Sequence, residues 1–384
     1  MLSPAEIADL RARTPIESVA AELGVALRRR AGRIVGPCPL CGGGKRSERF
    51  EVKRAGTADE AFVCAACATG GDVVKLTQLA HGLDFRAAVE RLGGARQIDP
   101  AEAARREREI ERKRAQREAE AAKYREAERR RCLSIWRSSA PAAGSPVEAY
   151  LRARAISEIA GMRVRFSAEQ AYFDGEVVDE ATGRKRPRLI HRGPAMLAPI
   201  LDAAGVFRGV HITWIDAERP GRKAELFDPD TGEQLPAKKM RGSKAGGFVD
   251  AFPGGDPARV YLGEGIESVG SAREGKRDGF VYRVAGDLGN LAGRAIETLP
   301  HPICKDRAGR PRRVPGPQPD LESDACPIPR ACRDLVLVKD GDSDPVLTDF
   351  AMQRAAARHR LPGRRIAVAE FGAGLDANDL LRAP

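Results

Sequence analysis

The chain has 384 residues, of which 31% are charged, and 65 Lys and Arg against 54 Asp and Glu leave a formal net charge of +11. This length exceeds one ordinary hydrophobic core, so we expect two or three domains. The positive excess favours nucleic acid over a membrane as partner, because no stretch approaches about 18 consecutive apolar residues. The N-terminus lacks the layout of a signal peptide, so we expect a cytoplasmic protein with metal-bound or free cysteines rather than disulfides.

The first hundred residues are predicted to hold short helices around a segment rich in Gly and Cys. Apolar residues at helical spacing in "SPAEIADLRARTPIESVAAELGVAL" predict two helices. The Gly- and Cys-rich segment runs from residue 36 to residue 71. "DVVKLTQLAHGLDFRAAVERLGG" then has helical periodicity, with Asp72 as an N-cap and Gly93-Gly94 as a stop.

Two C-x-x-C pairs lie in this segment, and they predict a zinc site. Two intervening residues allow both thiolates of a pair to reach one ion, and two pairs complete a tetrahedron. A closed four-cysteine set leaves no open coordination position, so we expect one structural zinc ion rather than unligated core cysteines or a redox pair. The predicted ligands are Cys38, Cys41, Cys64 and Cys67.

Cations lie between the two cysteine pairs, close to two aromatic residues. Arg49 and Lys53 are candidates for contacting nucleic-acid phosphates. Phe50 and Phe62 could stack on bases, but we expect them to fill the small core of the ribbon instead.

The composition changes abruptly to Arg, Glu, Lys and Ala in residues 101–131, which predicts a solvated helical spacer. Beyond it, "AMLAPILDAAGVFRGVHITWID" predicts a β-hairpin with its turn at Ala204-Gly205. Apolar strands then alternate with helices, which indicates a parallel sheet with functional loops at the carboxyl ends of its strands. The Pro- and Arg-rich residues 300–332 are predicted to be an inserted surface loop.

Carboxylates follow two of these apolar strands. Glu264 lies between two glycines in "LGEGIES", and Asp340, Asp342 and Asp344 follow "LVLV". Because parallel strands end at one edge of a sheet, we expect these carboxylates to converge and to bind Mg²⁺ or Mn²⁺. An EF-hand loop is excluded, since Pro345 and Ala351 stand where glycine and glutamate are needed. A solvated acidic turn is the remaining alternative.

These motifs resemble those of a known family. "YLGEGIES" followed by "VLVKDGDSD" is similar to the Toprim signature, and the N-terminal segment with "CPLC" and "FVCAAC" resembles the zinc-binding domain of DnaG-type primases. Cys41 departs from that family's usual Cys-His-Cys-Cys set. "EAYLRARAI", "KKMRGSKAGG" and "DANDLL" most resemble the primases of phages, plasmids and integrated elements.

The resemblance implies a multi-domain α/β protein. Its parts would be an N-terminal zinc ribbon with flanking helices, a charged helical linker, a mixed α+β basic subdomain, and a C-terminal Toprim domain with a Rossmann-like parallel sheet. In order, they would cover residues 1–97, 98–132, 133–258 and 259–384, with the Pro-rich insertion at about 300–332.

The resemblance also implies roles for individual residues. Asp340 and Asp342, and more loosely Asp344, would hold Mg²⁺, and Glu264 would act as a general base or a further ligand. Cations in "KKMRGSKAGG" would line a track for template or nucleotide phosphates, namely Lys238, Lys239, Arg241 and Lys244. Asp376 and Asp379 would support the metal site or cap the final helix.

The function implied is that of a DNA primase, a DNA-directed RNA polymerase that makes short RNA primers on single-stranded DNA from nucleoside triphosphates. A Toprim nuclease and a non-catalytic, zinc-ribbon accessory to a helicase remain as alternatives. A Toprim topoisomerase is disfavoured, because none of the five tyrosines has a catalytic setting. No P-loop is present, so a replicative helicase would be a separate chain.

Overall fold

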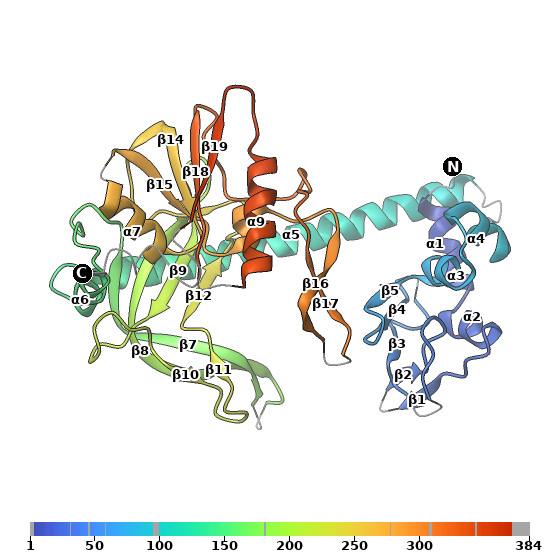
Figure 1. Ribbon diagram of the computed structural model, residues 1–384. Helices are drawn as coiled ribbons and strands as arrows, with labels where there is room; N and C mark the ends of the chain where they lie inside the picture. Colours follow the sequence, from blue (N-terminus) through green and yellow to red (C-terminus); the bar gives the residue numbers. More distant parts are fainter. Residues whose placement is uncertain are drawn as a thin grey trace. The chain divides into compact units, whose positions relative to one another are not determined.

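The computed structural model describes residues 4–30, 32–44, 47–57, 59–94, 100–179, 182–276, 278–306, 309–341 and 344–370. The chain divides into two compact units, Met1–Ala121 and Ala122–Pro384. One helix, α5 (Pro100–Ser138), crosses the boundary between them (Figure 1). Residues 107–125 of α5 are all exposed, and pairs such as Arg114 with Glu118 (3.1 Å) join successive turns. The predicted charged, solvated helix is confirmed.

The N-terminal unit contains a five-stranded antiparallel sheet whose strands follow chain order. Its helices pack with the sheet around one core that includes Leu10, Phe50, Phe62 and Leu76. The strands are β1 (Arg28–Arg30), β2 (Arg33–Gly36), β3 (Phe50–Lys53), β4 (Ala61–Cys64) and β5 (Thr69–Gly71), and the helices are α1 (Pro4–Arg13), α2 (Ile16–Glu22), α3 (Val73–His81) and α4 (Phe85–Arg91).

The helical segment predicted between Asp72 and Gly93-Gly94 consists of two helices, α3 and α4. Asp72 caps α3 as predicted, accepting a hydrogen bond from Lys75 N at 2.8 Å. Gly82 then adopts a φ of 64° and ends α3, and Asp84 caps α4. A left-handed glycine ends one helix and a capping aspartate begins the next, which explains the break between α3 and α4.

The C-terminal unit is built on a ten-stranded sheet with an antiparallel part and a parallel part. In the antiparallel part, β8 and β9 form the predicted hairpin, with Ala195 opposite Trp214. β13 joins the two parts, since it pairs with β8 on one side and with β15 on the other. The sheet is therefore continuous across residue 258, where the sequence suggested a domain boundary. The strands of the antiparallel part are β6 (Ala140–Pro141), β7 (Arg165–Val178), β8 (Lys185–Leu201), β9 (Phe207–Trp214), β12 (Lys238–Gly242) and β13 (Phe248–Val249), and β10 (Leu226–Phe227) and β11 (Gln234–Leu235) form a separate ribbon.

The parallel part has the order β15-β14-β18-β19, with helices on both faces, which confirms the predicted α/β class. Tyr261 of β14 packs with Val269 of α7 on one face, whereas Leu262 packs with Ala351 of α9 on the other. This alternation follows from the two-residue period of a strand. The elements are β14 (Asp256–Gly263), α7 (Ile266–Lys276), β15 (Phe280–Val284), α8 (Leu288–Ala292), β18 (Asp334–Val338), α9 (Pro345–Arg358) and β19 (Arg365–Ala369), and α6 (Pro146–Ala153) packs in the same core as α7.

The inserted segment is not the predicted surface loop throughout. β16 (Thr298–Lys305) and β17 (Pro311–Pro315) form an antiparallel hairpin that projects from the C-terminal unit (Figure 1). Leu299 pairs with Val314, and Val314 is buried at 1% exposure, so the base of the hairpin has its own apolar anchor. Prolines at edge positions, where no ladder N–H is needed, are compatible with this two-stranded ribbon.

Candidate functional site

Glu264 and Asp340 follow the carboxyl ends of two neighbouring parallel strands. Gly263, the last residue of β14, pairs in parallel register with Val338, the last residue of β18. Glu264 follows the first strand directly, and Asp340 follows the second after one residue. A Cβ on Gly263 would lie 2.6 Å from Val269 and 3.1 Å from Val338, so only glycine allows this close approach.

The carboxylate of Asp340 faces the turn that carries Glu264. A Cβ placed on Gly265 would be 4.0 Å from Asp340 Oδ2. Carboxylate oxygens at two adjacent strand ends are the donors that Mg²⁺ and Mn²⁺ take, so these residues fit such an ion. We call this pair of strand ends, with Glu264 and Asp340, the acidic edge.

Lys238 of β12 reaches the acidic edge and contacts Glu264. Its Nζ lies 3.4 Å from Glu264 Oε1. Burial by itself lowers the pKa of Lys238, but the charges of Glu264, Glu267 and Asp340 outweigh it, and the pKa is raised. Lys238 is therefore a cation held among carboxylates.

Two further acidic residues near this edge were missed by sequence reasoning. Glu267 is buried at 7% exposure and contacts Tyr150 Oη at 2.5 Å and Lys223 Nζ at 3.2 Å. Burial would raise its pKa, but Lys223 and the hydrogen bond from Tyr150 hold the pKa well below its usual range. The available signal in the sequence was the position of Glu267 in "EGIES", a charged residue on the buried side of the predicted helix.

Asp287 is the second of these residues. It follows β15, the neighbour of β14, by three positions, caps α8 through Asn290 N, and pairs with Lys244. Its place in "VAGDLGN", another strand followed by a polar loop, was the signal for it.

The other predicted metal ligands and supporting residues have different positions. Asp344 caps α9, accepting hydrogen bonds from Val346 N and Leu347 N, and both of its carboxylate oxygens lie near His301 Nε2 at 3.1 and 3.2 Å. The remaining three, Asp342, Asp376 and Asp379, lie outside the described residues.

The four cations predicted to line a phosphate track fall into two groups. Lys238 contacts Glu264 at the acidic edge, and Lys244 pairs with Asp287 beyond the neighbouring strand β15. Lys239 instead pairs with Asp174 at 2.7 Å and lies over the ring of Tyr172, and Arg241 pairs with Glu128 at 2.7 Å. Neighbours in β12 point to opposite faces, which separates Lys239 and Arg241 from Lys238.

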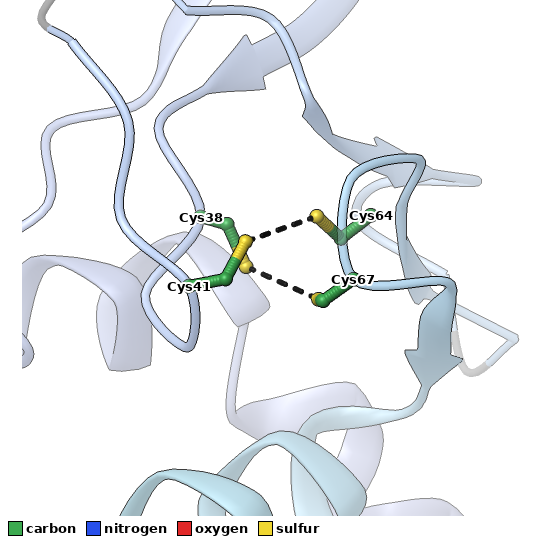
Figure 2. Close-up of side chains that lie close together, drawn as sticks. All are labelled: Cys38, Cys41, Cys64 and Cys67. Carbon is green, nitrogen blue, oxygen red and sulfur yellow. Dashed lines mark hydrogen bonds between the residues drawn. The ribbon is translucent and has the colours of Figure 1, made fainter. Parts of the chain in front are cut away.

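The four predicted zinc ligands converge in the N-terminal unit (Figure 2). The Sγ atoms of Cys38 and Cys67 are 4.0 Å apart, those of Cys41 and Cys64 are 3.7 Å apart, and all four lie within 4.8 Å of one another. Tetrahedral zinc with bonds of about 2.3 Å separates its sulfur ligands by about 3.8 Å. The cluster therefore fits one zinc ion. Burial raises the pKa of the Cys38 thiol to about 12, so a cation is needed to hold its thiolate at neutral pH.

The residues around the cysteines divide into core and surface groups. Phe50 and Phe62 are fully buried and stacked at 5.2 Å, so the expectation that they fill the ribbon core is confirmed. Arg49 donates to Ser47 Oγ at 3.1 Å, and Lys53 pairs with Glu51 at 2.7 Å while half exposed. A role for Arg49 or Lys53 in nucleic-acid binding stays a prediction.

The remaining cysteines are not part of this cluster. Cys132, Cys326 and Cys332 are buried in apolar cores. Cys304 lies with His301 and Asp344 in a second group within 4.8 Å. However, His301 Nδ1 accepts hydrogen bonds from the backbone N–H groups of Ile303 and Cys304, so the ring proton is on Nε2 and donates to Asp344. That tautomer has no lone pair left for a metal.

Comparison with protein-family models yields two matches. Residues 2–108 match the CHC2 zinc finger, the zinc ribbon of DnaG, and residues 126–251 match a domain of unknown function (DUF7146). The predicted resemblance to DnaG-type primases is confirmed for the zinc ribbon. Comparison with curated proteins finds no match.

Several solved structures are similar to the chain at low identity. A DnaG primase catalytic domain bound to single-stranded DNA has 15% identity and a TM-score of 0.40, with 68% of this chain and 78% of that chain covered. A DNA primase domain from Pseudomonas aeruginosa has 12% identity and a TM-score of 0.38, with 65% and 73% covered. The Escherichia coli primase catalytic core has 16% identity and a TM-score of 0.33, with 62% and 68% covered.

None of the helices in the described part of the chain combines the length and apolar composition needed to cross a membrane.

Proposed function

We propose that the chain is a DNA primase that synthesises short RNA primers on single-stranded DNA by metal-dependent nucleotidyl transfer. The observation that supports this proposal is that Glu264 and Asp340 follow the ends of two paired parallel strands, in a chain whose residues 2–108 match the zinc ribbon of DnaG. The sequence resemblance adds Asp342 to this pair. A phage, plasmid or integrated element as the source of the replicated DNA belongs to the same proposal.

The residues of the acidic edge would act on a nucleotide and a primer end. Asp340 and Asp342 would hold Mg²⁺ or Mn²⁺, which supplies charge for the triphosphate and lowers the pKa of the attacking 3′-hydroxyl. Glu264 would complete the ligand set or accept the hydroxyl proton. Because Asp344 already caps α9 and binds His301, we assign it to positioning this loop rather than to the metal.

Lys238 and Lys244 would both serve this reaction. Lys238 neutralises Glu264 across 3.4 Å and would turn to the triphosphate once a divalent cation takes over that charge. Lys244 pairs with Asp287 at the end of the neighbouring strand and is half exposed, so it is available to a phosphate at the same edge.

The zinc ribbon would supply the template contact. Four cysteine thiolates would leave its zinc without an open coordination position. The ribbon would therefore contribute a stiffened surface on which Arg49 and Lys53 face phosphates. Unwinding would need a separate replicative helicase as partner.

One assay separates this proposal from its rivals. The full-length protein is incubated with single-stranded DNA, labelled ribonucleotides and Mg²⁺ or Mn²⁺, in parallel with Asp340→Ala and Glu264→Ala. We expect short RNA products from the wild type and none from either variant. Degraded template instead of RNA would indicate a nuclease, and DNA binding with neither product would indicate a non-catalytic accessory.

A further inference from the structure

The hairpin of β16 and β17 carries an excess of positive charge that carboxylates in the described part of the chain neutralise only in part. Residues 298–315 contain five Lys and Arg and one Asp. Among the described residues, Arg310 pairs with Asp306 at 3.4 Å, whereas Lys305 and Arg312 are exposed and form no ion pair. Positive charge without a carboxylate partner, on a projecting element, indicates an external polyanion.

The base of this hairpin is held firmly against α9. His301, at 4% exposure, donates to Asp344, the N-cap of α9. Arg354 of α9 is also buried, at 3% exposure, and donates to Gly316 O at 2.5 Å and to Gly293 O at 3.0 Å, on either side of the hairpin. The cations are therefore presented by an anchored ribbon rather than by a loose loop.

This anchorage places the hairpin beside the acidic edge. Asp344, the N-cap of α9, follows Asp340 by four residues, so the hairpin and the proposed metal loop share one attachment point. A nucleic acid bound along the hairpin would therefore be continuous with the strand whose reacting end is held at the acidic edge.

The hairpin's composition favours duplex over single-stranded nucleic acid. Residues 298–315 contain no Phe, Trp or Tyr, and single-strand binding relies on aromatic rings that stack on bases. Duplexes are bound mainly through phosphates, by cations of the kind found here. Arg312 and Arg313 are neighbours in β17 and point to opposite faces, which separates Arg312 from the contact that Arg313 makes with Thr298.

We propose that the β16–β17 hairpin is a phosphate-binding finger that grips the RNA–DNA hybrid as it leaves the acidic edge. The choice of a hybrid rests on the proposed primase function, whereas the phosphate contact rests on the charges of the hairpin alone. Arg313 also donates to Thr298 Oγ1 at 2.8 Å, so it belongs to the hairpin's own framework. The binding cations are Lys305, Arg310 and Arg312.

The test measures binding of the full-length protein to a labelled short RNA–DNA hybrid and to the same DNA strand alone, by fluorescence anisotropy at several salt concentrations. The variant carries Lys305→Gln, Arg310→Gln and Arg312→Gln. The matched control carries Arg259→Gln, Lys276→Gln and Arg365→Gln. These changes remove the same amount of charge from the halves of β14, α7 and β19 that lie farther from the acidic edge. We expect the hairpin variant to lose about tenfold to a hundredfold in hybrid affinity and its log–log salt slope to fall by about two to three. The loss of single-strand affinity should be smaller, and the control should match the wild type.

Hybrid affinity and salt slope that are equal in the hairpin variant and the control would overturn this inference, as would an equal loss for hybrid and single strand. Binding needs no catalysis, so the two proposals fail separately. A wild type that makes no primer contradicts the proposed function but leaves the binding result standing. Normal primer synthesis with unchanged hybrid binding contradicts the finger alone.

Discussion

The zinc cluster and the acidic edge assemble metal-ligating side chains in different ways. In the N-terminal unit, all four ligands come from one short segment, and strands of only three or four residues surround them. In the C-terminal unit, Glu264 and Asp340 are far apart in sequence and meet because β14 and β18 are paired in a large sheet. We therefore expect the ribbon to depend on its zinc ion for folding, whereas the acidic edge is held by the sheet and, under the proposed function, would bind its ion for chemistry.

The largest effect should follow loss of a zinc ligand. Cys64→Ser should release the zinc and unfold the N-terminal unit, because structural zinc contributes on the order of 10 kcal/mol to folding. The C-terminal unit should keep its thermal transition. Zinc content, thermal unfolding and template binding measure these effects, with Cys304→Ser as the control. One zinc per chain together with unchanged DNA affinity would show that the four thiols are not a structural site.

A change at the acidic edge should have the opposite pattern, with activity lost and the fold kept. Asp340→Asn should lower primer synthesis by about a thousandfold or more, roughly 4 kcal/mol in the barrier, because the metal loses a charged ligand. Zinc content and thermal stability should stay at the wild-type level. Asp334→Asn, at the start of the same strand, is the matched control and should keep full activity.

The units should also differ in their response to acid, because the C-terminal unit buries a neutral histidine. Burial lowers the pKa of His211 to about 4, against about 6.5 in the unfolded chain. Between these values, the unfolded state takes up a proton that the folded state does not, so stability falls as the pH decreases. At pH 5, the loss should be about 2 kcal/mol. Urea unfolding at pH 7 and pH 5 measures it. His211→Gln should remove that part of the pH dependence, whereas His191→Gln, on the partly exposed face of β8, should retain it.

A smaller effect should separate two adjacent lysines of β12. Lys238→Met removes the cation 3.4 Å from Glu264, so the acidic edge should bind Mg²⁺ several-fold more tightly, a change of about 1 kcal/mol for a partly screened pair. Lys239→Met should leave the Mg²⁺ requirement unchanged, because Lys239 pairs with Asp174 on the other face. Titration of primer synthesis with Mg²⁺ gives both values. Equal shifts in the two variants would mean that Lys238 is not coupled to the metal.

The same contrast explains what the sequence could predict. The zinc ligands follow from local spacing, and Glu264 and Asp340 follow from the rule that parallel strands end at one edge. The ion pair between Lys238 and Glu264 could not be predicted, because it depends on which face of β12 meets the parallel part of the sheet. Glu267 was missed because the cost of burying its charge is offset by contacts with Tyr150 and Lys223, and both of these residues come from distant segments.

The hairpin shows a further limit of sequence reasoning. Its prolines and arginines predict a loop, but Val314, His301 and Arg354 supply buried contacts that stabilise a ribbon. The partners of His301 and Gly316 in these contacts are Asp344 and Arg354, which lie beyond the insertion in sequence, so no local pattern predicts them.

The most direct test of the account is to locate the divalent cation itself. Fe²⁺ bound in place of Mg²⁺ generates hydroxyl radicals that cut the backbone close to the ion, and peptide mapping of the full-length protein identifies the cuts. We expect cleavage next to Glu264 and next to Asp340, suppressed by excess Mg²⁺ and absent in Asp340→Asn. Cleavage elsewhere, or cuts at this edge that persist in Asp340→Asn, would contradict a metal site at the acidic edge.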